Sequence, residues 1–203
     1  GQEDQNVWTP TATNTAGSKR LVDGNFIQTA VRSRGAVLIW TDTALYQMQF
    51  IGPPLTFGFN QLGSACGCIG LNAAVDVGGV SFWMGTDSFF LFDGAVQKIP
   101  CSVQDYVFDD LNVNAKQDIF CAANTDYNEV MWFYASANSQ QIDRVVFYNY
   151  AENLWYVGTL SRTSWADRGT YDNPYAAEFV STDTTSTIST ITGLKAGRTF
   201  IHL

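Results

Sequence analysis

Short apolar runs separated by turn residues dominate the hydrophobic pattern, and the clearest example is Leu71–Asn112. Runs of this length, bounded by glycine and aspartate, are typical of antiparallel strands. The pairs Gly78-Gly79 and Asp93-Gly94 provide turns, because tight hairpins need residues that tolerate a positive φ. The stretch therefore predicts four strands, at Ala73–Val77, Val80–Gly85, Phe89–Phe92 and Ala95–Ile99.

A short helix is expected after the fourth strand, at about residues 103–112. Pro100 ends the strand because proline cannot donate a hydrogen bond to the ladder. Ser102 with Asp105 three residues later resembles a capping box. The apolar face of the helix is then formed by Val103, Val107 and Leu111.

The same alternation of strands and turns recurs on both sides of this stretch. Before it, strands are expected at Phe26–Val31, Ala36–Trp40, Leu45–Phe50 and Leu55–Phe59. Gln61–Gly70 follows as a link whose small residues suit a close crossing between units. After it, strands are expected at Ile119–Ala123, Glu129–Tyr134, Arg144–Tyr150 and Leu154–Leu160, and Pro174–Val180 and Thr199–Leu203 begin an incomplete fourth unit.

An internal repeat indicates the architecture. Trp40, Trp83 and Trp132 each stand in mid-strand before a polar turn, at spacings of 43 and 49 residues. Blades of a β-propeller repeat at about 40–50 residues and contain four antiparallel strands. We therefore expect an all-β fold of propeller-type blades, about three and a half of them, with a jelly roll or an immunoglobulin-type sandwich as the alternative. Three blades do not close a ring, since propellers need four or more.

Residues outside the blades are more polar. Residues 1–24 are expected to form an N-terminal arm or loop that packs Trp8 onto another surface, and residues 25–203 the blades. Ser181–Thr192, rich in serine and threonine, is expected to be a mobile insertion, and Ala135–Gln141 a polar loop tip. The sequence looks truncated at both ends, so we expect a fragment of a longer protein. No apolar run in it reaches the length of a membrane span.

The net charge is −8, from 11 Lys plus Arg and 19 Asp plus Glu. This sign is opposite to that of a surface that binds nucleic acid through its phosphates. An acidic wall would let DNA slide past without sticking, but a general contribution to solubility explains the same charge and is preferred.

The four cysteines are interpreted as reduced, mostly buried thiols. Cys66 and Cys68 have one residue between them rather than the two of a zinc knuckle, and the single histidine is His202. Cys101 and Cys121 flank the expected helix, but their spacing does not decide whether they pair.

No pattern for catalysis or cofactor binding stands out, so the chain is expected not to be an enzyme and to carry no metal or cofactor. Asp110–Asn114 matches the first positions of a calcium loop, but Ala115 replaces the required glycine. One histidine near the end of the chain argues against a catalytic triad. Paired carboxylates of a glycoside hydrolase stay a minor alternative, with candidates at turns: Asp87, Asp93, Asp126 and Asp167.

Aromatic side chains raise one more possibility. Trp155, Tyr156 and Trp165 are able to stack on sugar rings, as in a carbohydrate-binding propeller, although such residues more often belong to a blade core.

Four phrases in chain order resemble one known family. They are Trp8–Gly17, Leu38–Tyr46, Gly52–Phe59 and Val103–Asn112, and the resemblance extends from Trp8 to about Ala176. They are similar to the tail hub or nozzle proteins of short-tailed bacteriophages, also called packaged-DNA stabilisation proteins.

The resemblance implies a structural virion protein with β-propeller domains. It implies a sixfold ring of copies below the portal and its adaptor, in a virion tail assembled in the host cytoplasm, with double-stranded DNA only as passing cargo. Tail fibres or spikes would attach to its loops, for which the candidate contact residues are Asn138, Ser139, Gln140, Arg162, Trp165 and Arg168. The alternative from another class is a carbohydrate-binding propeller that recognises host surface glycan.

Overall fold

The structure, a computed structural model, describes residues 6, 8–11, 14, 16–52, 55–168, 173–180 and 198–202, the backbone alone being described for 178–180 and 198–202. The insertion expected at Ser181–Thr192 lies outside these residues.

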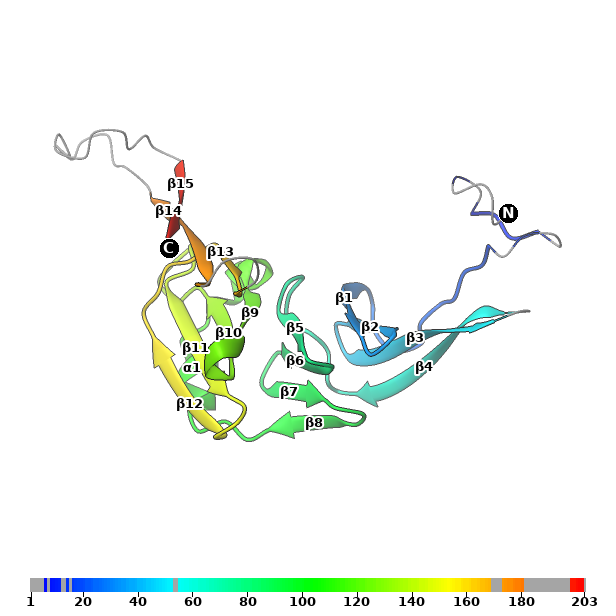
Figure 1. The fold of residues 1–203 in the computed structure, drawn as a ribbon, viewed down its shortest axis with the longest axis horizontal. Helices are drawn as coiled ribbons and strands as arrows, with labels where there is room; N and C mark the ends of the chain where they lie inside the picture. The colour runs from blue at the N-terminus through cyan, green and yellow to red at the C-terminus, as the bar shows by residue number, and fades with distance from the viewer. Residues whose placement is uncertain are drawn as a thin grey trace.

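Three four-stranded antiparallel sheets follow one another along the chain, and in each sheet consecutive strands are neighbours (Figure 1). Sheet 1 contains β1 (Ile27–Ser33), β2 (Ala36–Thr41), β3 (Ala44–Gly52) and β4 (Thr56–Ser64). Sheet 2 contains β5 (Ala74–Val77), β6 (Val80–Met84), β7 (Phe89–Phe92) and β8 (Val96–Ile99). Sheet 3 contains β9 (Phe120–Asn124), β10 (Glu129–Tyr134), β11 (Arg144–Asn149) and β12 (Leu154–Gly158).

A fourth, three-stranded sheet contains β13 (Ser164–Ala166), β14 (Tyr175–Val180) and β15 (Arg198–His202). The described helical elements are short: α1 (Gln104–Asp109) and the 3-10 turns η1 (Val113–Asp118) and η2 (Thr125–Tyr127). The predicted all-β class, with four-stranded antiparallel units and one short α-helix, is confirmed.

Three local predictions were wrong. β4 continues to Ser64, because Gln61 and Gly63 stay paired with β3 across a bulge instead of starting the link. β13 lies within Ser161–Asn173, which the turn-rich sequence predicts to be a loop, and it pairs with β14. The helix begins at Gln104, so Val103 rather than Ser102 occupies the N-cap and no side chain caps it.

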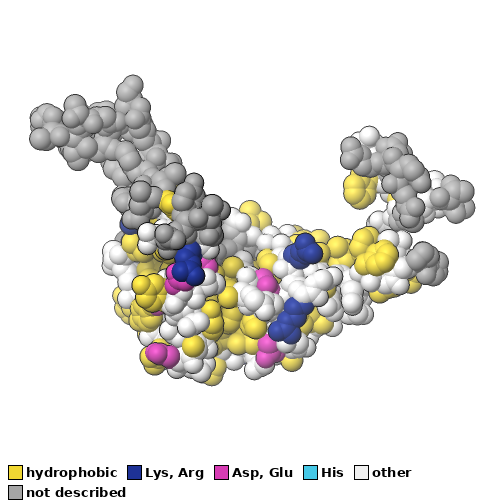
Figure 2. Space-filling model, in the orientation of Figure 1, with side chains coloured by type: hydrophobic (Ala, Val, Ile, Leu, Met, Phe, Trp, Pro, Cys, Tyr) yellow, Lys and Arg dark blue, Asp and Glu magenta, His cyan; other side chains and the backbone are white. Residues whose placement is uncertain are grey.

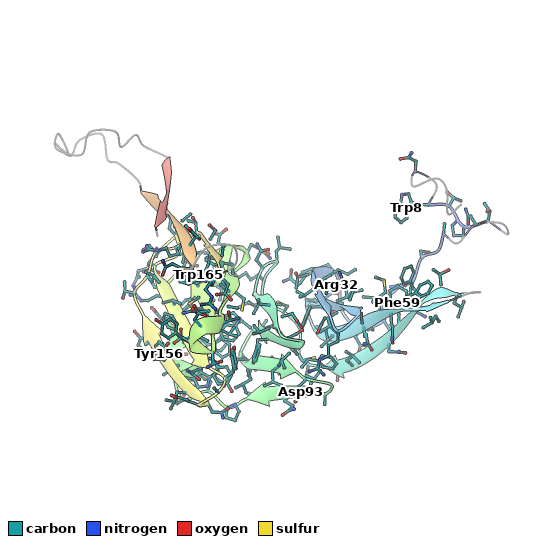
Figure 3. All side chains as sticks on the ribbon, in the orientation of Figure 1. Trp8, Arg32, Phe59, Asp93, Tyr156 and Trp165 are labelled. Atoms are coloured by element: carbon teal, nitrogen blue, oxygen red, sulfur yellow. The ribbon has the colours of Figure 1, made fainter. Side chains whose placement is uncertain are left out.

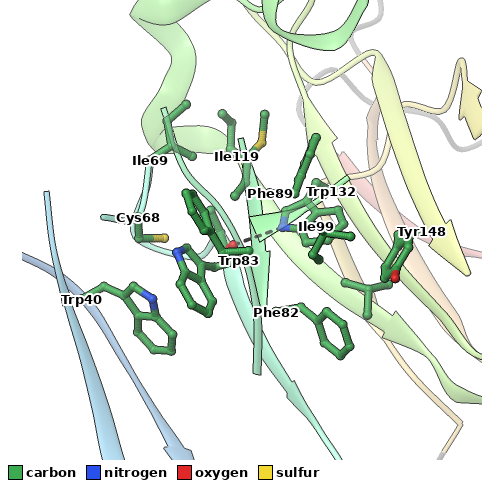
Figure 4. Close-up of a cluster of buried hydrophobic side chains, with 14 of the residues drawn as sticks. Trp40, Cys68, Ile69, Phe82, Trp83, Phe89, Ile99, Ile119, Trp132 and Tyr148 are labelled. Atoms are coloured by element: carbon green, nitrogen blue, oxygen red, sulfur yellow. Dashed lines mark hydrogen bonds between the residues drawn. The ribbon is translucent and has the colours of Figure 1, made fainter. Parts of the chain in front are cut away.

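The core runs from one sheet to the next as a chain of aromatic side chains (Figure 4). Trp40, Trp83 and Trp132 occupy the second strand of sheets 1, 2 and 3, and each is fully buried. The Trp40 and Trp83 rings meet edge to face at 5.3 Å, and Phe89 of sheet 2 lies 4.8 Å from the Trp132 ring. The spacing of the three tryptophans therefore reflects a repeated position in the fold.

The indole groups also connect sheets by hydrogen bonds. Trp83 Nε1 donates to the Cys66 carbonyl in the link after sheet 1 at 2.9 Å. Trp132 Nε1 donates to the Ala73 carbonyl beside sheet 2 at 3.2 Å, as the dashed line in Figure 4 shows. Trp40 Nε1 is buried and has no hydrogen-bond partner among the described residues. Each of the two bonded indoles thus fixes its sheet to the chain segment that precedes it.

The link between sheets 1 and 2 crosses closely, as its small residues predicted. A Cβ atom at Gly67 would lie 2.1 Å from the Asp42 carbonyl oxygen and 2.5 Å from the Thr43 nitrogen. Real Cβ atoms do not approach backbone this closely, so only glycine fits at this position.

Candidate functional site

A cleft of about 700 Å³ lies where sheet 3 meets the loops around it. Its volume is within the range of ligand-binding clefts. The side chains that line it are mainly amides and hydroxyls, with two carboxylates and two apolar groups: Asn72, Gln117, Asp118, Phe120, Ser139, Gln140, Gln141, Ile142, Asp143, Ser161 and Thr163.

Two loops that the sequence singled out as contact candidates meet at this cleft. The first loop is Ala135–Gln141, and it contributes Ser139 and Gln140. The second is the loop expected at Arg162–Gly169, and Ser161 and Thr163 on either side of Arg162 line the cleft. Asn138 is an exposed residue of the first loop and does not line the cleft. The sequence identified both loops as contact surfaces but contained no signal that they lie together.

The first loop is fixed at its base rather than free along its whole length. Asp143 accepts hydrogen bonds from the backbone N and the Oγ of Ser136, both at 2.8 Å, and from Arg144 Nη1 at 3.0 Å. Arg144 Nε also lies 3.5 Å from Asp110 Oδ2. Ala135 and Ser136 are therefore buried, and the prediction of an exposed tip holds only for the residues beyond them.

The run Asp110–Asn114, which resembles the start of a calcium loop, also helps to fix the base of the first loop. Asn112 Nδ2 donates to the Ser139 carbonyl at 2.7 Å, and Asn112 Oδ1 accepts from the Asn114 backbone N at 3.0 Å. The Asn112 amide thus holds the loop to η1. Among the described residues, no group of three or more His, Cys, Asp or Glu is placed to hold a metal ion.

Four polar side chains of the cleft are free to bind a ligand. The side chains of Asn72, Gln117, Asp118 and Gln140 make no hydrogen bond within the described part of the chain. One ring face of Phe120 stacks on Phe133 at 4.5 Å. Neutral donors and acceptors beside an aromatic ring suit a polyhydroxylated ligand, whereas a lining without Lys, Arg or His does not favour an anion.

The remaining contact candidates hold the second loop to sheet 3. Trp165 is half-buried, and its Nε1 donates to the Ala123 carbonyl at 2.9 Å. Arg168 Nη2 lies 3.1 Å from Asp126 Oδ1. Asp167 accepts a hydrogen bond from Thr125 Oγ1 at 2.7 Å. Asp126 and Asp167, which the sequence offered as candidate catalytic carboxylates, therefore help to fix the second loop to sheet 3.

The other aromatic residues considered for sugar stacking are packed into the fold. Trp155 lies 4.7 Å from Phe89 by ring centroids and donates to the Pro100 carbonyl at 2.9 Å. Tyr156 stacks on Phe147 at 4.5 Å, and its hydroxyl donates to Glu129. The Trp155 ring is therefore packed against the core, whereas the Tyr156 ring is stacked on one face and stays 41% exposed.

The four cysteines are thiols in the structure, as predicted. Burial raises the pKa of Cys68 to about 12 and the pKa of Cys101 to about 11. It also raises the pKa of Cys66 and of Cys121. Because the thiolate is the nucleophilic form, burial opposes reactivity at all four positions.

Trp8, which is expected to pack onto another surface, lies on an arm that stands away from the sheets, and its side chain is 77% exposed (Figure 3). It has no packing partner in the described part of the chain that would bury it.

Comparisons with known proteins identify no family. No family model and no curated protein matches the chain. One solved structure that it resembles distantly is a putative exported protein from Bacteroides fragilis, with 8% sequence identity and a TM-score of 0.35 over 77% of this chain and 67% of that one. None of the described helices is long and apolar enough to span a membrane.

Proposed function

We propose that this chain is a structural protein of a bacteriophage virion, part of the tail hub or nozzle below the portal. The proposal depends mainly on one observation, the aromatic core that continues through sheets 1, 2 and 3 without interruption. Such a core makes the blades one rigid wall, which suits a protein that works by assembly. The sequence phrases that resemble those of tail hub proteins support the same function.

In this function the sheets are blades of a propeller whose copies, six in the hub proteins that the sequence resembles, surround the DNA channel. The net charge of −8 suits a wall past which DNA slides. The loops at the cleft, with Asn138, Ser139, Gln140 and Arg162, then face tail fibres, spikes or the portal adaptor. They have the exposed polar tips that contact loops require.

The test is to label purified phage particles with an antibody raised against the chain and to image them by electron microscopy. We expect label at the tail, close to the portal vertex. Particles that contain the protein only in the capsid, or that lack it, would rule out the proposed function.

A second candidate is a glycan-binding protein, which the cleft favours. Its unused amides and the Phe120 ring suit a neutral sugar. Calorimetric titration with oligosaccharides tests it, with Gln117→Ala as the cleft variant and Tyr127→Ala, at an exposed position outside the cleft lining, as the control. Saturable heat that Gln117→Ala abolishes and Tyr127→Ala retains would favour the glycan-binding function.

A further inference from the structure

The hairpin of β3 and β4 projects from one end of the molecule and is apolar at its tip (Figure 1). Phe50 is 65% exposed and Leu55 73% exposed, and Ile51 and Phe57 are also exposed. Figure 2 shows hydrophobic atoms over this part of the surface. An exposed cluster of large apolar side chains marks an interaction site more often than chance.

Both faces of the tip are apolar. Phe50 and Phe57 form a cross-strand ring pair on one face, with centroids 5.9 Å apart. On the other face Ile51 covers Gly58, where a Cβ would lie 3.2 Å from Ile51 Cγ2. The tip therefore presents apolar surface in two directions, and none of the described sheets covers it.

The hairpin is also uncharged. The sequence has no Asp, Glu, Lys, Arg or His between Asp42 and Asp76, in a chain of net charge −8. Two copies of an acidic chain repel each other over most of their surfaces. A contact made through this hairpin avoids placing carboxylates against carboxylates.

The backbone indicates that the occupant is a protein strand. β4 is the edge strand of sheet 1, so one side of its ladder has no strand partner among the described residues. Unpaired ladder groups are satisfied by another strand, whereas lipid hydrocarbon offers them no hydrogen bonds.

A matching surface lies at the opposite end of the molecule (Figure 3). β12 is the edge strand of sheet 3, and no charged residue lies between Glu152 and Arg162. Leu154 is 55% exposed, and Tyr156 and Val157 are exposed beside it. This edge is uncharged, partly apolar and unpaired, as the hairpin is.

We propose that the β3–β4 hairpin of one copy docks on strand β12 of a second copy, head to tail. Contacts between different surfaces of identical chains build rings or open chains, whereas contacts between identical surfaces stop at a pair. The choice of head-to-tail contact over hairpin-to-hairpin contact rests on the proposed function.

Sedimentation of three charge variants tests the contact. Leu55→Lys changes the hairpin, Leu154→Lys changes β12, and Val113→Lys is the control, at a residue 67% exposed on η1. Since all three residues are exposed, each variant should fold as the unchanged chain does, which circular dichroism checks. We expect the unchanged chain and the Val113→Lys chain to associate, and the other two to associate at least ~10-fold more weakly.

Mixing the two weakened variants distinguishes the geometry. A Leu55→Lys copy retains an intact β12 and a Leu154→Lys copy retains an intact hairpin, so an equimolar mixture should form pairs and no larger species. The contact is excluded by a mixture that stays monomeric, or by an unchanged chain that is monomeric at about 100 μM, a concentration at which micromolar interfaces form.

Equal association of the Leu154→Lys chain and the unchanged chain also excludes the contact between the hairpin and β12. Hairpin-dependent binding to neutral phosphatidylcholine vesicles would show that a membrane, not a copy, is the occupant. None of these outcomes affects the antibody labelling of the virion, so the contact and the proposed function fail separately.

Discussion

The three equivalent tryptophans do not make equivalent hydrogen bonds. Trp83 and Trp132 donate to carbonyls of preceding segments, whereas the Trp40 indole N–H is buried without a partner in the described part of the chain. A buried donor without an acceptor lowers stability, and a buried carbonyl that loses its donor does the same.

Substitution by phenylalanine at two of these positions should therefore have different costs. Trp83→Phe leaves the Cys66 carbonyl unsatisfied, whereas Trp40→Phe removes an N–H that already lacks a partner. Because both changes remove the same volume, we expect Trp83→Phe to lower the free energy of unfolding by about 1–3 kcal/mol more than Trp40→Phe. Urea unfolding followed by circular dichroism measures the difference, and equal losses would contradict a structural role for this hydrogen bond.

The buried thiols predict a pH dependence of stability. Burial raises the pKa of Cys68 from 9.0 to about 12, so the folded chain retains a proton that the unfolded chain loses at alkaline pH. The contribution of the Cys68 thiol to the free energy of unfolding is complete below about pH 9 and is lost as pH rises toward 12, because unfolding then releases a proton. We expect the free energy of unfolding to fall from about pH 9 toward about pH 12. The fall should be shallower for Cys68→Ala, and equal slopes for both chains would contradict the burial of this thiol.

At the scale of elements, the link between sheets 1 and 2 depends on one glycine. A Cβ at Gly67 would overlap the Asp42–Thr43 backbone, whereas a Cβ at Gly17 meets no atom within 4 Å. Backbone cannot move aside as a flexible side chain does, so we expect Gly67→Ala to lower the free energy of unfolding by at least about 1–3 kcal/mol. Gly17→Ala is the matched control and should be near neutral in thermal or urea unfolding. A Gly67→Ala chain of unchanged stability would show that the sheets do not cross as closely as described.

The loop beside the cleft depends in the same way on Asp143. Asp143→Ala removes two hydrogen bonds to Ser136 and the contact with Arg144. We expect faster proteolysis within residues 136–142 and a loss of about 1–3 kcal/mol in the free energy of unfolding. Asp87→Ala, at an exposed turn, is the control. Cleavage of both variants at the rate of the unchanged chain would contradict a fixed base for this loop.

The sequence predicted these elements well where turn chemistry and apolar runs coincide. β7 and β10 have the predicted bounds, and the turns at Gly35 and at Gly78-Gly79 have the positive φ that the glycines indicated. β4 was predicted too short because residues 60–64, which extend it, are mostly polar or small and resemble a loop. β13 was missed because a strand of three residues has no period to detect.

The candidate site was predicted only in parts. Turn-like composition identified both loops, but the cleft between them depends on Asp143 and Asn112, whose hydrogen bonds join residues up to 27 positions apart. Pairings at that separation leave no local pattern in the sequence. The packing of Trp165 and Trp155 against neighbouring sheets also depends on the fold, so the sequence left open whether they face solvent.

At the scale of the whole molecule, two uncharged, partly apolar surfaces lie at opposite ends. One end has the hairpin of β3 and β4, and the other has the edge strand β12 (Figure 1). The rigid core between them fixes the distance and angle from one end to the other. A rigid unit with two different contact surfaces is suited to assembly into a closed ring.

The most direct test of assembly is the mass of the purified full-length protein in solution, measured by sedimentation, together with electron microscopy of the same sample. We predict a closed ring of several copies with a central opening wide enough for duplex DNA, at least about 20 Å given the depth of its grooves and backbone. Single copies at every concentration that bind an oligosaccharide in the cleft would contradict the proposed function and favour glycan binding.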